Sequence, residues 1–504
     1  TPTSIHDIAP PSIWRPVPEN PAPTKPGDIA FHKPSAPSLP RAPSQASCKL
    51  SAFKAADRRR LDRLAKAYKK DKSLLGKLPS SPQTIPRSVT PPPTDQPKPT
   101  HENIYAHPGP TRPDLVCAVR RALLWHQPAP RETDFRFTVD SSAAEHNLSI
   151  LEDFDLDLQR AIHAVGGTTL QPGSEFKPSD ILESIFAPHP LWGSMKETLD
   201  NGIFYPLTDI SEEERMNDLD EALTRGNHKS ARDKPATLQH LIEADVSQGF
   251  ALPLPVHCTR RIPGVILAPL GIAEQATIQP DGQIVPKDRL THDQSFQYGS
   301  NKSVNSRVIK ELLQVVVYSH CLPRLLHQII DYRLRHPGIP ILIVKGDYKS
   351  AFRRGHLQIA EGLASSCQVT DKIILISLRM TFGGAPNPSR WGDISEPACD
   401  LVNELLRSEE WSPEEFEPFI PIEIPKAAYL PKDIPFAQAK PLSVHIPPSD
   451  VGKCDVFIAD KIGITPDLGN NVRRLATIIP LLLCLLARPL HNNQPTLPTA
   501  PPPL

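Results

Sequence analysis

Apolar residues recur at helical spacing between about residues 114 and 248. Within residues 150–165, for example, apolar side chains stand at every third or fourth position, at Leu151, Phe154, Leu158, Ile162 and Val165. This spacing places them on one face of a helix. The pattern predicts helices at 114–127, 150–165, 178–187 and 194–200, and charged helices within 208–248 whose first turn Ser211 caps.

After residue 250 the pattern changes to short β-like segments separated by Pro and Gly. Asp281-Gly282 is a strong signal for a hairpin turn between two of these segments. A helix is expected at 303–335, kinked at Pro323, and an apolar β-branched run follows from Ile339 to Val344. This run predicts a buried strand that presents Asp347 at its end, where a carboxylate can be held rigidly for a metal ion.

Three segments lack this periodicity and are rich in proline. Residues 1–50, 78–113 and 491–504 are expected to be disordered arms, and Pro91-Pro92-Pro93 offers a ligand for a proline-binding module or forms part of a plain linker. Residues 51–77 interrupt the arms as a basic amphipathic helix. Such a helix either contacts nucleic acid or an acidic partner, or is simply solvated.

Composition restricts the class of protein. The 504 residues include 60 prolines, and Lys+Arg and Asp+Glu are both 56, so any basic surface must be local. The eight cysteines are scattered without metal-ligand spacing, which favours a reduced intracellular protein, cytoplasmic or nuclear. The longest apolar stretch, Leu475–Ala487, is too short to span a bilayer, so no membrane partner is expected. The absence of an initial Met suggests a fragment or a processed polyprotein piece.

Three motifs follow one another in the second half of the chain. The first is Asp347-x-x-x-Ala351-Phe352, followed by Arg353 and Arg354, which either meet phosphates or are solvated. The second is a glycine-rich turn at Phe382-Gly383-Gly384, with Pro386 and Trp391 beyond it and a helix beginning near Ser389. Such a turn allows a template strand or nucleotide to approach the backbone. The third is CDVFIAD, residues 454–460, which ends in Ala459-Asp460.

In this order and at these distances the motifs resemble the palm of retrotransposon-type reverse transcriptases, over about residues 250–490. The resemblance implies that Asp347, the backbone carbonyl of Tyr348 and Asp460 bind Mg²⁺ and that Phe352 selects deoxynucleotides. It implies nucleotide or template contacts by Phe382, Gly383 and Gly384. In the segment 286–296 it implies that Lys287 and Arg289 hold the incoming triphosphate, ahead of a His292-Asp293-x-Ser295 element that is otherwise a polar turn. The implied partners are an RNA or DNA template-primer and dNTPs.

The sequence departs from the family at the third motif. The family carries two adjacent aspartates there, but the first position is Ala459, whose methyl group cannot bind a cation. Asp455 has the right strand parity but lies four residues away, about 13 Å along an extended chain. The segment 400–450 resembles a long insertion, and the resemblance ends after the palm, without a thumb, connection or RNase H domain.

These observations predict an α+β fold. The expected parts are a disordered region at 1–113 containing the basic helix, a helical platform at 114–249, a fingers-like part at 250–335, a palm-like part at 336–490 and a disordered tail at 491–504. The expected function is that of a reverse transcriptase-like protein of a retroelement, inactive or impaired here. Two alternatives stay open: a non-enzymatic scaffold that binds nucleic acid or proteins, and an unrelated α+β domain in which the motif matches are accidental.

Overall fold

The structure is a computed structural model, and it describes residues 12–13 (backbone only), 112–278, 283–314, 316, 321–348, 350–416 and 449–487. All of these residues belong to one compact unit. Nearly all of the proline-rich arms, the basic helix at 51–77 and the tail at 491–504 lie outside the described residues. Two short pieces of the arms are described. Residues 12–13 form a short strand, although 1–50 was expected to be without structure, and Arg112, at the end of the arm 78–113, pairs with Glu404 at 2.8 Å.

The N-terminal half of the described chain is helical, as the apolar spacing predicted. Its helices are α3 (Leu115–Leu123), α4 (Ser141–Asp153), α5 (Leu158–Val165), α6 (Ser179–Phe186), α7 (Trp192–Asn201), α8 (Glu212–Arg225), α9 (Lys229–Arg232) and α10 (Pro235–Val246). The single helix expected at 150–165 is wrong. Asp155 and Leu156 have positive φ angles, which end α4, and the Asp157 carboxylate then caps α5 by accepting from the Arg160 backbone N–H. Ser211 caps α8 in a capping box with Glu214.

The strands form three antiparallel sheets. The two-stranded sheet pairs β3 (Leu270–Ile278) with β4 (Ile284–His292) in antiparallel order, as expected for the predicted hairpin, although its turn residues Asp281-Gly282 lie outside the described residues. A three-stranded sheet has the order β2-β7-β6, from β2 (Ala251–Pro255), β7 (Ile373–Ser377) and β6 (Cys367–Gln368). The four-stranded sheet has the order β1-β5-β9-β8, from β1 (Ser12–Ile13), β5 (Ile341–Gly346), β9 (Asp460–Pro466) and β8 (Lys453–Phe457).

The remaining helices are α11 (Cys321–Arg335), α12 (Ala351–Arg354), α13 (Ile359–Ala364), α14 (Asn387–Arg407), α15 (Pro413–Phe416) and α16 (Asn471–Leu486), with short 3₁₀ turns at Val256–Cys258, Asn305–Arg307 and Lys310–Leu312. The long helix expected at 303–335 is wrong in its first part. Residues 303–314 contain only the two 3₁₀ turns. Pro323 does not kink a helix but lies in the first turn of α11, where a backbone N–H has no partner within the helix.

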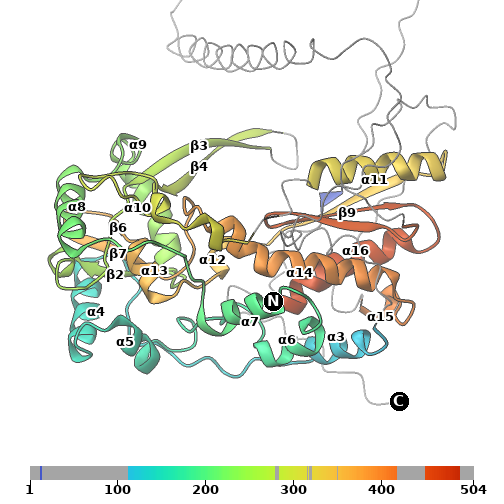
Figure 1. Cartoon of the computed structure of the whole chain (residues 1–504), viewed down its shortest axis with the longest axis horizontal. Coiled ribbons are helices and arrows are strands. Elements are labelled where there is room, and N and C mark those ends of the chain that lie inside the picture. Colours follow the sequence, from blue (N-terminus) through green and yellow to red (C-terminus); the bar gives the residue numbers. More distant parts are fainter. Residues whose placement is uncertain are drawn as a thin grey trace, which may run out of the picture. The chain divides into compact units, whose positions relative to one another are not determined.

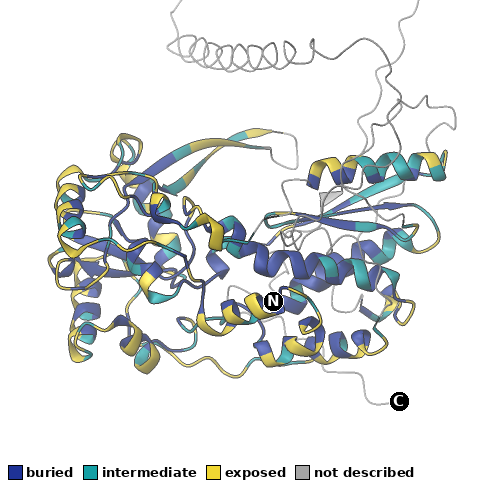
Figure 2. Ribbon diagram, viewed as in Figure 1, coloured by how far each residue is buried: buried dark blue, intermediate teal, exposed yellow. Residues whose placement is uncertain are grey.

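The segment 400–450 is not a continuous insertion. Residues 400–407 complete α14 and bury Leu401, Val402 and Leu405 in the core, α15 follows, and residues 417–448 lie outside the described chain. Figure 2 shows α14 as a largely buried helix in the middle of the molecule. It begins at Asn387, two residues before the helix start expected at Ser389.

Helices cover both faces of the four-stranded sheet. α11 contacts β5, β8 and β9 from one side, whereas α14 and α16 contact the sheet from the other (Figure 1). Glycine makes the close packing of α16 possible. A Cβ added at Gly346 would lie 2.5 Å from Ile479 Cγ2, and one at Gly463 would lie 2.6 Å from Leu475 Cδ1. The end of β5 is therefore held firmly against α16.

The fold is α+β, as predicted. No described helix is both long enough and apolar enough to cross a membrane. The cysteines in the described part of the chain are free thiols, and most of them are buried.

Candidate active site

Two aspartates meet at one end of the four-stranded sheet. β5 pairs antiparallel with β9, and the last pair is Gly346 opposite Lys461. Asp347 directly follows β5 and Asp460 is the first residue of β9, so continuing the register places Asp347 next to Asp460. The two residues therefore lie on neighbouring strands, as the motif order led us to expect. The structure brings together chain segments separated by more than a hundred residues.

The two carboxylates influence each other. Burial is the main cause that raises the pKa of Asp347, and the negative charge of Asp460 raises it further, while Lys345 and Lys461 act in the opposite direction. Asp347 is exposed at the surface, yet the protein surrounds its carboxyl group closely enough for desolvation to dominate the shift in its pKa.

Lys345, which sequence reasoning did not single out as a site residue, forms an ion pair with Asp460. Its Nζ lies 3.0 Å from Asp460 Oδ2, with side-chain exposures of 35% and 27%. Side chains two residues apart on a strand share a face, so Lys345 and Asp347 project from the same side of β5. The alternation of side chains along the strand could have indicated that Lys345 lies on the same face as Asp347. Its pairing with Asp460 on β9, however, is a tertiary contact that the sequence does not reveal.

The hairpin between β8 and β9 has a two-residue turn. Phe457 pairs with Asp460, which leaves Ile458 and Ala459 at the tip. Ile458 has a φ of +57°, an unusual conformation for a β-branched residue, and Ala459 is half-buried against the main core. The position at which the resembling family has a second aspartate thus carries a packed methyl group.

Asp455 is fully engaged elsewhere. Its carboxylate accepts two hydrogen bonds from the Arg324 guanidinium of α11, at 2.6 and 2.7 Å, and both side chains are buried. Because it is held by this ion pair, Asp455 does not replace the missing carboxylate at position 459.

The aromatic residues of the first two motifs lie together. The rings of Phe352 and Phe382 are 5.5 Å apart, and Phe352 and Trp391 are 6.4 Å apart. Tyr348 packs its ring edge against Trp391 at 5.5 Å, and its side chain is buried in the core. Phe382 remains 46% exposed, so this aromatic cluster of Tyr348, Phe352, Phe382 and Trp391 extends from the core to the surface.

The glycines of the second motif are needed for internal packing. Gly383 has a φ of +130°, and a Cβ there would lie 1.8 Å from the His292 carbonyl oxygen. A Cβ at Gly384 would lie 2.9 Å from the side chain of Asn387. The close backbone approach that we expected for a template or nucleotide is made by the protein itself at these positions. The Asn305 side chain fixes the turn by bonding the Gly383 carbonyl and the Ala385 N–H, each at 2.7 Å.

Lys287 and Arg289 lie within β4, not in a loop after the hairpin. They stand opposite Gln275 and Ala273 and are both exposed. His292, at the end of β4, is buried, and burial lowers its pKa to about 3. Asp293 accepts a hydrogen bond from the Ser295 N–H and pairs with His228, which corresponds to the polar-turn alternative.

Arg353 and Arg354 are neither solvated nor free to meet phosphates. Both are buried; Arg353 pairs with Asp245, and Arg354 lies 3.7 Å from Glu175. Glu175 also pairs with the buried Arg379 at 3.1 Å. These ion pairs fasten α12 to the surrounding segments, so the two arginines serve the fold.

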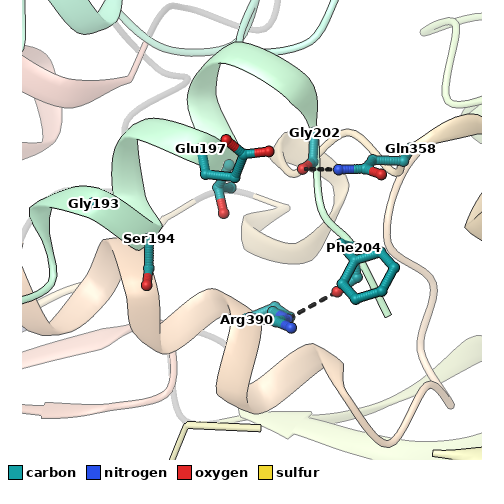
Figure 3. Close-up of a pocket in the computed structure, with 8 residues that line it drawn as sticks. Gly193, Ser194, Glu197, Gly202, Phe204, Gln358 and Arg390 are labelled. Atoms are coloured by element: carbon teal, nitrogen blue, oxygen red, sulfur yellow. Dashed lines mark hydrogen bonds between the residues drawn. The ribbon is translucent and has the colours of Figure 1, made fainter. Parts of the chain in front are cut away.

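A separate cavity of about 490 Å³ lies between α7 and the start of α14 (Figure 3). Phe204, Gln358 and Arg390 line it, and Arg390 Nε donates to the Phe204 carbonyl at 2.8 Å. No sequence-predicted site residue lines this cavity. Near it, the buried Asp393, which sequence reasoning also missed, lies 3.6 Å from Arg390, and burial raises its pKa to about 6.

The residues at the carboxylate pair do not fit two Mg²⁺ ions. Two-metal sites need several oxygen ligands with enough negative charge to hold both ions about 3.5–4 Å apart. Here Asp460 is paired with Lys345 and position 459 has no ligand. Within the described ranges, no group of three or more His, Cys, Asp or Glu side chains could hold a metal ion.

The chain was compared with protein-family models, with curated proteins and with solved structures, and none of the three comparisons gives a match.

Proposed function

We propose that this chain is a reverse transcriptase-like protein of a retroelement, derived from an enzyme of template-directed DNA synthesis and catalytically impaired. One observation carries the proposal: β5 pairs with the β8–β9 hairpin so that Asp347 stands beside Asp460 at the end of the sheet. The contact between Phe352 and Phe382 brings the first two motifs together and supports the same conclusion.

In an active polymerase of this kind, two divalent ions position the attacking and leaving oxygens of the nucleotidyl transfer. This chain retains Asp347 and Asp460 but has Ala459 at the remaining position. Loss of a direct metal ligand should cost more than the roughly 10–100-fold typical of residues that only support a ligand. The proposal therefore assigns the chain binding of template-primer and dNTP without efficient turnover.

The exposed β4 cations favour nucleic acid as the partner. Lys287 and Arg289 are two residues apart on one strand, so both project from the same face of the hairpin. Charges on an exposed hairpin can contact a phosphate backbone without desolvating the core. Asp288, between them, projects to the other face and pairs with Lys234 at 3.1 Å, which leaves the basic face uninterrupted.

Primer extension tests the catalytic part. The unmodified chain, Asp347→Ala and Ala459→Asp are compared on a primed RNA template with Mg²⁺ or Mn²⁺. We expect the unmodified chain to extend no better than Asp347→Ala, and Ala459→Asp to gain extension that depends on Asp347. Robust, Asp347-dependent extension by the unmodified chain would show that it is an active polymerase.

A non-enzymatic scaffold that binds nucleic acid is the second candidate. The ion pair between Lys345 and Asp460 favours it, because this pair neutralises one of the two carboxylates that remain. The absence of extension by all three proteins, together with retained binding of template-primer, would support the scaffold. The proline-binding partner rests on Pro91-Pro92-Pro93, which lie outside the described residues, and it stays a prediction, as does the cytoplasmic or nuclear location.

A further inference from the structure

The charge balance at the end of β5 differs from that of a metal site. Lys345 and Asp347 project from one face of β5, and Asp460 stands opposite Asp347 on β9. Lys345 Nζ lies 3.0 Å from Asp460 Oδ2, within the range of a charge-assisted hydrogen bond. An ammonium group therefore occupies one approach to the carboxylate that a divalent ion would need.

A second lysine, Lys461, adds positive potential from the opposite face of the sheet. Lys461 follows Asp460 and projects to the opposite face of the sheet, where it is fully buried and its Nζ lies 5.5 Å from the centre of the Tyr348 ring. Among the described residues, its Nζ has no hydrogen-bond partner. Asp347 and Asp460 are the carboxylates whose charges act on it.

We propose that Lys345 is a resident counter-ion that takes the place of a divalent cation at Asp460, so that the Asp347–Asp460 pair is balanced by the protein's own charge. The inference rests on the proposed function in one respect only, that the pair is the remnant of a metal site. Two carboxylates and Lys345 together carry a single net negative charge, against the four positive charges of two divalent ions.

Removal of the ammonium should open the site to a single ion. At a separation of about 5 Å, repulsion between a divalent ion and an ammonium group weakens ion binding by about tenfold or more, even in a medium as polar as water. Lys345→Met keeps an unbranched side chain of similar length and removes only the charge. Lys345→Arg keeps the charge and should continue to exclude the ion.

Titration of the full chain with Mn²⁺, followed by electron paramagnetic resonance of the free ion, measures this directly. We expect no saturable Mn²⁺ binding that depends on Asp460 in the unmodified chain or in Lys345→Arg. Lys345→Met should gain one Mn²⁺ site, with an affinity at least about tenfold higher than any residual binding by the unmodified chain. The double variant Lys345→Met/Asp460→Asn should lose this site. Lys229→Met, which removes one exposed charge from α9, is the matched control and should not gain the site.

Two outcomes would overturn the inference: Asp460-dependent Mn²⁺ binding by the unmodified chain, or no gain of binding in Lys345→Met. Thermal unfolding of each variant establishes that it is folded, and Lys345→Gln replaces the Met variant if that one is unfolded. These results are independent of primer extension by Ala459→Asp and of template-primer binding, which test the proposed function. The two proposals can therefore fail separately.

Discussion

Arg324 and Asp455 form a bidentate ion pair, at 2.6 and 2.7 Å, with side chains that are only 4% and 2% exposed. The pair joins α11 to β8 on the same face of the sheet as Asp347 and Asp460. It fixes the helix beside the candidate site and occupies the one further carboxylate on β8.

The first prediction concerns this pair. Arg324→Ala should lower the free energy of unfolding by about 3–5 kcal/mol, because it leaves the Asp455 carboxylate buried without its counter-charge. The double variant Arg324→Met/Asp455→Leu should recover most of that loss, since it leaves no unpaired charge. Urea unfolding measures both. Arg260→Ala, at the exposed pair with Asp220, is the control and should have little effect. A similarly small effect of Arg324→Ala would show that α11 is not held by this pair.

The second prediction concerns Gly383. Gly383→Ala should destabilise the protein by several kcal/mol, because φ is +130° and the new Cβ would meet the His292 carbonyl at 1.8 Å. Gly193→Ala in α7 is the matched control. Nothing lies within 4 Å of a Cβ there, so the gain in helix propensity should stabilise by up to about 1 kcal/mol. Comparable unfolding midpoints for the two variants would contradict the packing of the turn against β4.

The third prediction is a pH dependence set by Asp393. Its pKa in the folded protein is about 6, above the ordinary value of 3.8, so the folded state binds more protons than the unfolded state between these values. The free energy of unfolding therefore falls as pH rises from about 4 to about 6, and the contribution stays unfavourable above that, on the order of 3 kcal/mol.

Asp393→Asn should remove this slope and be more stable than the unmodified chain at pH 7. Chemical unfolding at several pH values measures the difference, which separates Asp393 from other titrating groups. Asp371→Asn, at an exposed position between β6 and β7, controls for the change in charge. Parallel pH profiles for the unmodified chain and Asp393→Asn would show that the buried carboxyl titrates normally.

The fourth prediction follows from the proposed nucleic-acid partner. Lys287→Ala and Arg289→Ala should each weaken binding of a primed template and reduce the salt dependence of log K by about 0.7–0.9 for each phosphate that the variant no longer neutralises. Lys372→Ala, an exposed charge in the turn between β6 and β7, should leave the slope unchanged. Fluorescence anisotropy across a range of salt concentrations measures it, and an unchanged slope for both β4 variants would place the nucleic acid elsewhere.

The sequence by itself determined the local elements and the order of the motifs. Helical spacing located α3 and α5 to α10 but not α4, which begins at Ser141; Asp281-Gly282 indicated the β3–β4 hairpin, and the β-branched run located β5 to within two residues. These features depend on residues near one another in the chain, whose spacing is visible directly. The sequence pattern did not reveal the break between α4 and α5, because the break depends on positive φ angles at Asp155 and Leu156, which are not glycines.

Only the tertiary structure decided which groups meet at the site. The partners of Asp460, Asp455 and Gly383 are Lys345, Arg324 and the His292 carbonyl, each distant in sequence and brought close by strand pairing or helix packing. Arg353 and Arg354, which looked like phosphate-binding candidates, are buried in ion pairs with Asp245 and Glu175. The charge and burial of a side chain depend on neighbours supplied by the whole fold, so motif spacing identified the carboxylates but not the cation that balances them.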